Sequence, residues 1–359
     1  MQRTFMKNKS IDKTKIILSV LALSSLGLLF ATVIGLIYFN SRVNLYSSGG
    51  NEQINNYKHV YAFIADDTDD ALSNSLYKDL VEYGKAHDCF VDRVGNGLAS
   101  DYSKKDLFNI AIYSGVDGII VQGDGKSETD ELIKKADKAG IPVVTVITDN
   151  SKSVRKSFIG MNDFSVGTDY GAQIINAAKD SGKQSGDVVS VLILMNSQYS
   201  NQTTMLSAIQ EKVASANPVG PKIKLTTETI TSITSFSIQE NVKDLLDNYS
   251  VLPDVIVCLS DINTRSVYQC IVESNRVGST RILGYYDSDT VIKGIERGSI
   301  FSTFTVATEQ MAKFCVDALN EYKETGNVSA YFSTDYELVT GETLAAKQLA
   351  GGKGKDEED

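Results

Sequence analysis

At 359 residues, 42% of them apolar, the chain is long enough to bury more than one hydrophobic core, so we expect two lobes or domains. Its 45 acidic and 35 basic side chains give a net charge of −10, which disfavours binding to nucleic acid or to anionic lipid headgroups. The four cysteines are too few and too scattered for a disulfide framework, and none forms a C-x-x-C pair. We expect buried thiols, with a bridge between Cys258 and Cys270 as the alternative.

An uncharged stretch, Ile16–Phe39, follows five basic residues near the N-terminus. Its 24 residues suffice to cross a bilayer as a helix, and the basic flank predicts a cytoplasmic N-terminus. A cleaved signal peptide is the alternative, but its apolar core is usually about 7–15 residues long. We therefore expect a single-pass protein of the cell membrane with its C-terminal part outside the cytoplasm: a basic cytoplasmic tail at 1–15, a transmembrane helix or uncleaved signal anchor at 16–39 and a flexible linker at 40–57.

Beyond the linker, short apolar runs alternate with helical patterns. The expected strands lie at 60–64, 118–121, 141–146, 188–194, 255–259 and 282–285. The first is followed by apolar residues at three- and four-residue spacing, which is typical of a helix with one buried face. Parallel strands need long crossovers, usually helical, so this alternation predicts parallel sheets covered by helices on both faces.

Polar residues follow nearly every expected strand. They are Asp66–Asp70, Gln122–Asp124, Asp149–Asn150, Asn196–Gln198, Ser260–Asp261 and Tyr286–Asp287. Ligands of such sheets bind beyond the carboxyl ends of the strands, and these side chains donate and accept hydrogen bonds as sugar hydroxyls require. Helix capping is the alternative at each single position, because Asp, Asn and Ser are also favoured N-cap residues.

Enzyme signatures are absent from the sequence. Gly123–Ser127 resembles a phosphate-binding loop, but Ile120 stands where the motif requires its first glycine. The only histidines, His59 and His87, have no second metal-ligating residue at ligand spacing. We therefore expect a protein that is not an enzyme and has no catalytic residue, metal site or cofactor.

Several motifs in order along the chain resemble a known family. They are Gly115–Ile120, Ala139–Thr145, Phe158–Asp163, Leu252–Val257, Ile282–Asp287 and Gly294–Gly298. Together they resemble the type I periplasmic binding proteins of the ribose- and galactose-binding kind, whose fold is shared by the sensor domains of LacI-type repressors. The resemblance implies an α/β protein of two Rossmann-like lobes with parallel sheets, joined by a three-segment hinge that closes over a ligand.

The resemblance also implies where the chain divides. Crossings between the lobes would fall near Gly160, Val306 and Phe332. The expected parts are an N-terminal lobe at 58–161 and 307–332, a C-terminal lobe at 162–306 and 333–345, and a disordered tail at 346–359.

A partial ligand site carries over from the family. The expected ligand-binding residues are Asp67, Asp70, Ser73, Asn74, Gln122, Asp149, Asn150, Thr203, Ser260, Asp261 and Asp287. Relatives stack the sugar on aromatic residues after the first strand, where this chain has Asp70–Ser73, and they often carry arginines where it has Asn150 and Thr203. Without cleft arginines an anionic ligand would meet uncompensated carboxylates. A neutral sugar, a cationic ligand and a vestigial site remain open.

Two functions share the implied fold. The first is an extracytoplasmic receptor that binds a small neutral carbohydrate and delivers it to an ABC-type importer. The second is a membrane-anchored sensing module that signals to a histidine kinase or another membrane partner without transport. The expected partners are a small-molecule ligand, an ABC permease or sensor kinase, and the membrane itself through the N-terminal helix, but no nucleic acid. A repressor is excluded because no helix-turn-helix precedes the sensor-like part.

Overall fold

The computed structural model describes Thr32 and residues 57–65, 70–96, 102–216, 220–232 and 234–352, the last five without their side chains. Apart from Thr32 and Tyr57, the expected cytoplasmic tail, membrane helix and linker lie outside these residues. No helix within the described ranges is both long and apolar enough to span a membrane.

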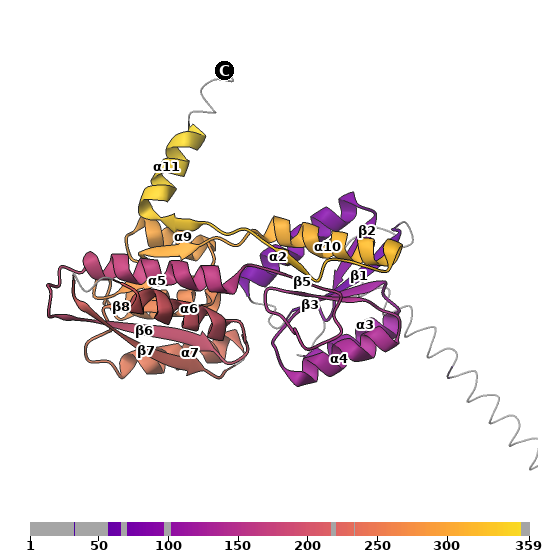
Figure 1. Ribbon diagram of the computed structural model, residues 1–359, viewed down its shortest axis with the longest axis horizontal. Helices are drawn as coiled ribbons and strands as arrows, with labels where there is room; N and C mark the ends of the chain where they lie inside the picture. The colour runs from indigo at the N-terminus through magenta and orange to yellow at the C-terminus, as the bar shows by residue number, and fades with distance from the viewer. Residues whose placement is uncertain are drawn as a thin grey trace, which may run out of the picture. The chain divides into compact units, whose positions relative to one another are not determined.

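The N-terminal lobe is a six-stranded, wholly parallel sheet between two pairs of helices (Figure 1). Its strand order is β11-β5-β4-β3-β1-β2, comprising Tyr331–Ser333, Ser157–Gly160, Val143–Val146, Gly118–Gln122, His59–Ile64 and Cys89–Arg93. One face is covered by α2 (Ala71–Ala86) and α10 (Thr308–Thr325), the other by α3 (Lys104–Ser114) and α4 (Ser127–Lys138). Helix α2 forms here because Leu72, Leu76 and Leu80 place one apolar stripe against the sheet.

The C-terminal lobe is a second six-stranded sheet, in the order β12-β10-β9-β8-β6-β7. These strands are Leu338–Thr340, Ser302–Phe304, Arg281–Leu283, Val255–Cys258, Val188–Asn196 and Lys222–Ile230, and only β12 runs antiparallel to its neighbour. Its helices are α5 (Asp163–Lys179), α6 (Gln202–Ala214), α7 (Ser235–Asp247), α8 (Asp261–Glu273) and α9 (Asp289–Glu296). The predicted two-lobed α/β fold with mainly parallel sheets is confirmed.

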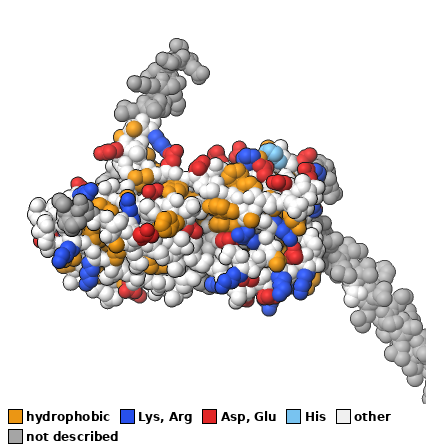
Figure 2. Space-filling model, viewed as in Figure 1, with side chains coloured by type: hydrophobic (Ala, Val, Ile, Leu, Met, Phe, Trp, Pro, Cys, Tyr) orange, Lys and Arg blue, Asp and Glu red, His pale blue; other side chains and the backbone are white. Residues whose placement is uncertain are grey.

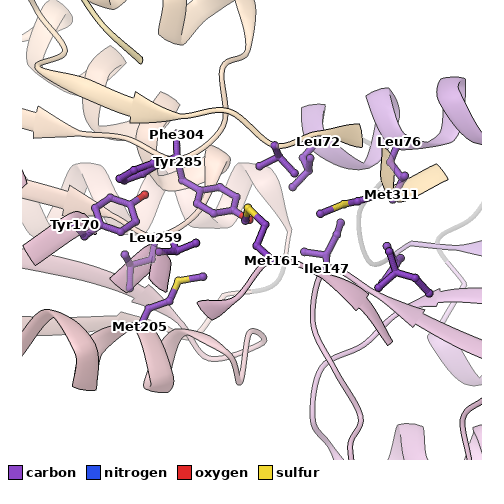
Figure 3. Packing of buried hydrophobic residues seen from close by; sticks show 14 of the residues in the cluster. Leu72, Leu76, Ile147, Met161, Tyr170, Met205, Leu259, Tyr285, Phe304 and Met311 are labelled. Atoms are coloured by element: carbon purple, nitrogen blue, oxygen red, sulfur yellow. The ribbon is translucent and has the colours of Figure 1, made fainter. Parts of the chain in front are cut away.

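Three chain segments join the lobes: β5 to α5, β10 to α10, and β11 to β12. Met161 and Val306, on the first two of these segments, belong to one apolar cluster that contains core residues of both lobes. Figure 3 shows part of this cluster, with Ile147 from the first lobe, Met205 from the second, and Met161 between them. The lobes are therefore packed together at the hinge as well as covalently linked.

The end of the chain differs from expectation. Helix α11 spans Gly341–Gly352, so the expected disordered tail at 346–359 begins inside a helix, and residues 353–359 lie outside the described ranges. The Thr340 hydroxyl accepts a hydrogen bond from the Thr343 amide at 3.2 Å, and Leu344 packs on the core of the second lobe. A capped start and an apolar contact therefore stabilise this helix.

The four cysteines are buried and free, so the bridge considered between Cys258 and Cys270 is absent. On the face shown in Figure 2, acidic and basic side chains are interspersed.

Candidate functional site

A pocket lies between the lobes, at the carboxyl ends of strands from both sheets. The first lobe contributes Asp70, Leu72, Gln122, Ile147 and Thr148, and the second contributes Tyr199, Asn201, Gln202, Leu259, Ser260, Asp261 and Tyr285. Its empty volume is about 340 Å³, which includes open solvent at the mouth. This is where an open α/β sheet binds its ligands.

Asp70 and Ser260 both cap a helix and line the pocket. One Asp70 carboxylate oxygen accepts the Ser73 amide at 2.8 Å, which caps α2. The Ser260 hydroxyl caps α8 by accepting the Asn263 amide at 3.3 Å, and it donates to Asn196 Oδ1 at 2.9 Å. Capping and a position on the pocket wall are therefore compatible at these residues. The positive ends of two helices also approach the pocket from opposite lobes.

Asp261 is the most deeply buried carboxylate of the pocket wall. It accepts hydrogen bonds from Arg265 Nε at 2.7 Å and from the Ser288 hydroxyl at 3.0 Å. Burial raises the pKa of Asp261, and the nearby Arg265 guanidinium opposes this rise. The expectation that no arginine reaches the cleft carboxylates is thus corrected: Arg265 lies one helical turn after Asp261, at the spacing that allows such pairs.

Gln122 and Tyr285 present polar atoms to the pocket. Gln122 Oε1 accepts the Ser73 hydroxyl at 3.2 Å, while its Nε2 has no partner within the described part of the chain. The Tyr285 hydroxyl likewise has no hydrogen-bond partner among the residues that the structure describes. Since Gln122 is 2% and Tyr285 5% exposed, these groups can satisfy their hydrogen-bonding capacity only inside the pocket.

Of the expected ligand-binding residues, Asp70, Gln122, Ser260 and Asp261 line the pocket, whereas Ser73 lies behind Gln122. Asp149 does not line the pocket, because Arg155 Nε and Nη2 clamp its carboxylate, with Nη2 at 2.6 Å. Asn150 instead holds the β3–α4 loop, through four hydrogen bonds to neighbouring groups.

The remaining expected residues also lie elsewhere. Asn74 is exposed and accepts a hydrogen bond from Arg93, and Thr203 is exposed on α6. Asp287 is half-buried after β9 but does not line the pocket. Asp67 lies outside the described residues.

Several wall residues were not expected, and a backbone feature explains part of this. Ile147 has φ +67°, which is rare for a β-branched residue, so the chain turns sharply after β4. As a result Ile147 and Thr148 face the pocket in place of Asp149. The second lobe adds two aromatic residues to the wall, Tyr199 and Tyr285, whereas no aromatic residue stands at Asp70–Ser73, as the sequence predicts.

Contacts across the mouth hold the two lobes together. The Thr148 hydroxyl of the first lobe donates to Asn201 Oδ1 of the second at 3.3 Å, and Asn201 Nδ2 is held within the second lobe by donating to Asp163 at 3.0 Å. A Cβ added to Gly125 of the first lobe would lie 2.4 Å from Ser200 Oγ of the second. The lobes are therefore in contact around the pocket.

Asp163 makes the stability of the fold depend on pH. Burial raises its pKa to about 6, above the ordinary 3.8, and the Asp149 charge adds to this. Between these values the folded protein keeps a proton that the unfolded chain has lost, so this contribution to stability falls as pH rises toward about 6. Asp163→Asn, which can still accept from Asn201, should raise the free energy of unfolding at pH 7 by about 1–3 kcal/mol.

Urea unfolding of both proteins at pH 4 and pH 7 checks this prediction. At pH 4 the wild-type carboxyl is largely protonated, so the gain should shrink toward zero. An equal gain at both pH values would show that the Asp163 charge is not its cause.

Comparisons with known proteins identify the family. The periplasmic binding protein domain matches residues 61–327, so the chain belongs to the periplasmic binding protein family. This is a family of solute-binding proteins and not of enzymes. In the described ranges, no group of three or more His, Cys, Asp or Glu side chains is placed to hold a metal ion. No curated protein shows a significant match to the chain.

Solved structures share the fold at low sequence identity. GanP, a glucose-galactose binding protein from Geobacillus stearothermophilus, is 19% identical with a TM-score of 0.68, over 80% of this chain and 98% of its own. A solute-binding protein from Agrobacterium vitis bound with alpha-D-tagatopyranose is 15% identical with a TM-score of 0.69, and the match covers 82% of this chain and 98% of its own. A chain of the XylFII–LytSN complex is 18% identical with a TM-score of 0.66, and the match covers 79% of this chain and 98% of its own.

Proposed function

We propose that this protein is an extracytoplasmic solute-binding protein that binds a small carbohydrate in the pocket between its lobes and closes on it. The observation that carries the proposal is the pocket wall, which combines carboxylate, amide, hydroxyl and tyrosine groups from both lobes. Each sugar hydroxyl is both donor and acceptor, so such a wall suits a polyhydroxyl ligand. The glucose-galactose and tagatopyranose ligands named for two structural neighbours support the same ligand class.

As its physiological role we propose the receptor of an ABC-type sugar importer. The alternative is a sensing module that passes closure to a histidine kinase or another membrane partner, and the XylFII–LytSN complex supports it, because a protein of this fold is solved there with a second protein. Deleting the gene separates the two roles. Loss of uptake of the bound sugar indicates transport, whereas intact uptake with a lost transcriptional response indicates sensing.

We further propose that Ile16–Phe39 anchors the protein in the membrane, with residues 1–15 in the cytoplasm and 40–57 as the linker. The anchor would keep the binding lobes beside a permease or kinase in the same membrane. Alkaline extraction of membranes tests it: an anchored protein stays in the pellet, and a cleaved, soluble one is released.

Differential scanning calorimetry of the full-length protein in detergent tests ligand binding. The panel is neutral monosaccharides, disaccharides, amino sugars and nucleosides. A ligand that binds only the folded state stabilises it by about 2.7 kcal/mol at a hundredfold excess over its Kd, which raises Tm by a few degrees. At least one sugar should raise Tm, and a panel without any shift would contradict the proposed function.

A further inference from the structure

Two carboxylates from opposite lobes share the pocket. Asp70 belongs to the first lobe and Asp261 to the second, and both line the wall. Burial raises the pKa of Asp70, the hydrogen bonds with Ser73 oppose this rise, the charge of Asp261 adds to it, and the charge of Arg265 opposes it. Only Arg265 pairs with either carboxylate within the described ranges, and its ion pair is with Asp261. Asp70 itself has no ion-pair partner within the described ranges, although the Arg265 charge acts on it.

Independent features of the wall point to a ligand with hydroxyl groups. Gln122 and Tyr285, which are 2% and 5% exposed, both line the pocket, and no hydrogen bond joins Gln122 Nε2 or the Tyr285 hydroxyl to another described residue. Buried donors are rarely left unsatisfied in folded proteins, so these two atoms call for acceptor atoms on a bound molecule. An ammonium group alone has no acceptor and could not satisfy them.

We infer that the ligand is an amino sugar, whose ammonium group lies near Asp70 and Asp261 and whose hydroxyl oxygens accept from Gln122 and Tyr285. This inference rests on the proposed function and specifies its ligand class. Closing the lobes desolvates both carboxyls, so their charged forms and the repulsion between them oppose closure. A cationic ligand offsets that repulsion, whereas a neutral sugar of the same shape leaves it in place.

Isothermal titration calorimetry at pH 7 with full-length protein in detergent tests the inference. The probes are D-glucosamine and D-galactosamine, each compared with its neutral parent sugar and its N-acetyl derivative. The N-acetyl derivative keeps the nitrogen without its charge. At least one amino sugar should bind ten or more times tighter than both of its comparators.

Two other outcomes are decisive. If a neutral sugar binds as tightly as its amino counterpart, the inference is wrong and the proposed function stands. If no sugar of either kind binds, the proposed function fails and the inference built on it fails with it.

Asp70→Asn locates the effect. Asparagine caps a helix as well as aspartate does, so the variant should fold with α2 intact. It should reduce the preference for the amino sugar to less than threefold. The control Glu82→Gln removes one charge from an exposed site on the same helix and should keep the full preference. A preference that survives Asp70→Asn, or that both variants lose equally, would overturn the assignment to Asp70.

Discussion

Gly125→Ala should weaken sugar binding by about 10- to 100-fold while the protein still folds. Gly125 lies on the β3–α4 loop, and an added Cβ would be 2.6 Å from Ser200 Cβ and 2.4 Å from its Oγ. The hydroxyl can rotate away, but the Ser200 Cβ cannot. Because Ser200 belongs to the other lobe, closure must leave a gap or strain the loop. Overpacking of this kind costs about 1–3 kcal/mol, which corresponds to that loss of affinity.

A matched control isolates the clash from backbone strain. Gly125 has φ +70° and Gly140 has φ +79°, so alanine is strained at both, but nothing lies within 4 Å of an added Cβ at Gly140. Gly140→Ala should therefore lower stability by a similar amount and leave sugar affinity unchanged. Adding Ser200→Gly to Gly125→Ala should restore affinity. Equal affinities in the two single variants would refute interlobe contact at Gly125.

Asn150→Ala should lower the free energy of unfolding by about 3 kcal/mol with no ligand present. Asn150 Oδ1 accepts the amides of Asp124 at 2.9 Å and Gly125 at 3.3 Å. Its Nδ2 donates to the Lys126 carbonyl at 3.1 Å and to Asp130 at 2.8 Å. The side chain is 1% exposed, so alanine leaves buried donors and acceptors unpaired, at about 1–3 kcal/mol each before relaxation.

Urea unfolding measures this loss, with Asn248→Ala as the control. Asn248 is exposed and donates one hydrogen bond to the Asp244 carbonyl, so its replacement should cost about 0.5 kcal/mol or less. If Asn150→Ala instead keeps wild-type stability and loses only sugar affinity, then Asn150 contacts the ligand directly and its role as a loop clamp is wrong.

The fold followed from the sequence because its signals repeat along the chain. Buried parallel strands are continuous apolar runs, and the stretches at 118–121 and 255–259 predict them directly. Strand β7 was missed because it lies at an edge and alternates polar with apolar residues, as in Lys222–Leu225. Helix α11 was missed because the glycines and charged residues after Ala350 favoured a disordered tail, although the Leu, Ala, Lys and Gln residues at 344–350 are good helix formers.

The pocket followed only in part, for two physical reasons. Sequence position places a residue at a strand end but does not reveal which neighbouring side chain it pairs with. Here Asp149 forms an ion pair with Arg155. A single unusual dihedral at Ile147 then changes which residues face the cleft. Asp70 and Ser260 do line the pocket, because a helix N-cap at a strand end lies at the same edge of the sheet as the pocket.

Lobe closure on a bound sugar is the central claim, and single-molecule Förster resonance energy transfer measures it most directly. Lys134→Cys and Lys243→Cys put labels on exposed helical sites of the two lobes, and the four native cysteines are buried. The sugar selected by calorimetry should increase the fraction of full-length molecules in a high-transfer, closed state, and Gly125→Ala should diminish that increase. An unchanged distribution at saturating sugar would contradict ligand-driven closure.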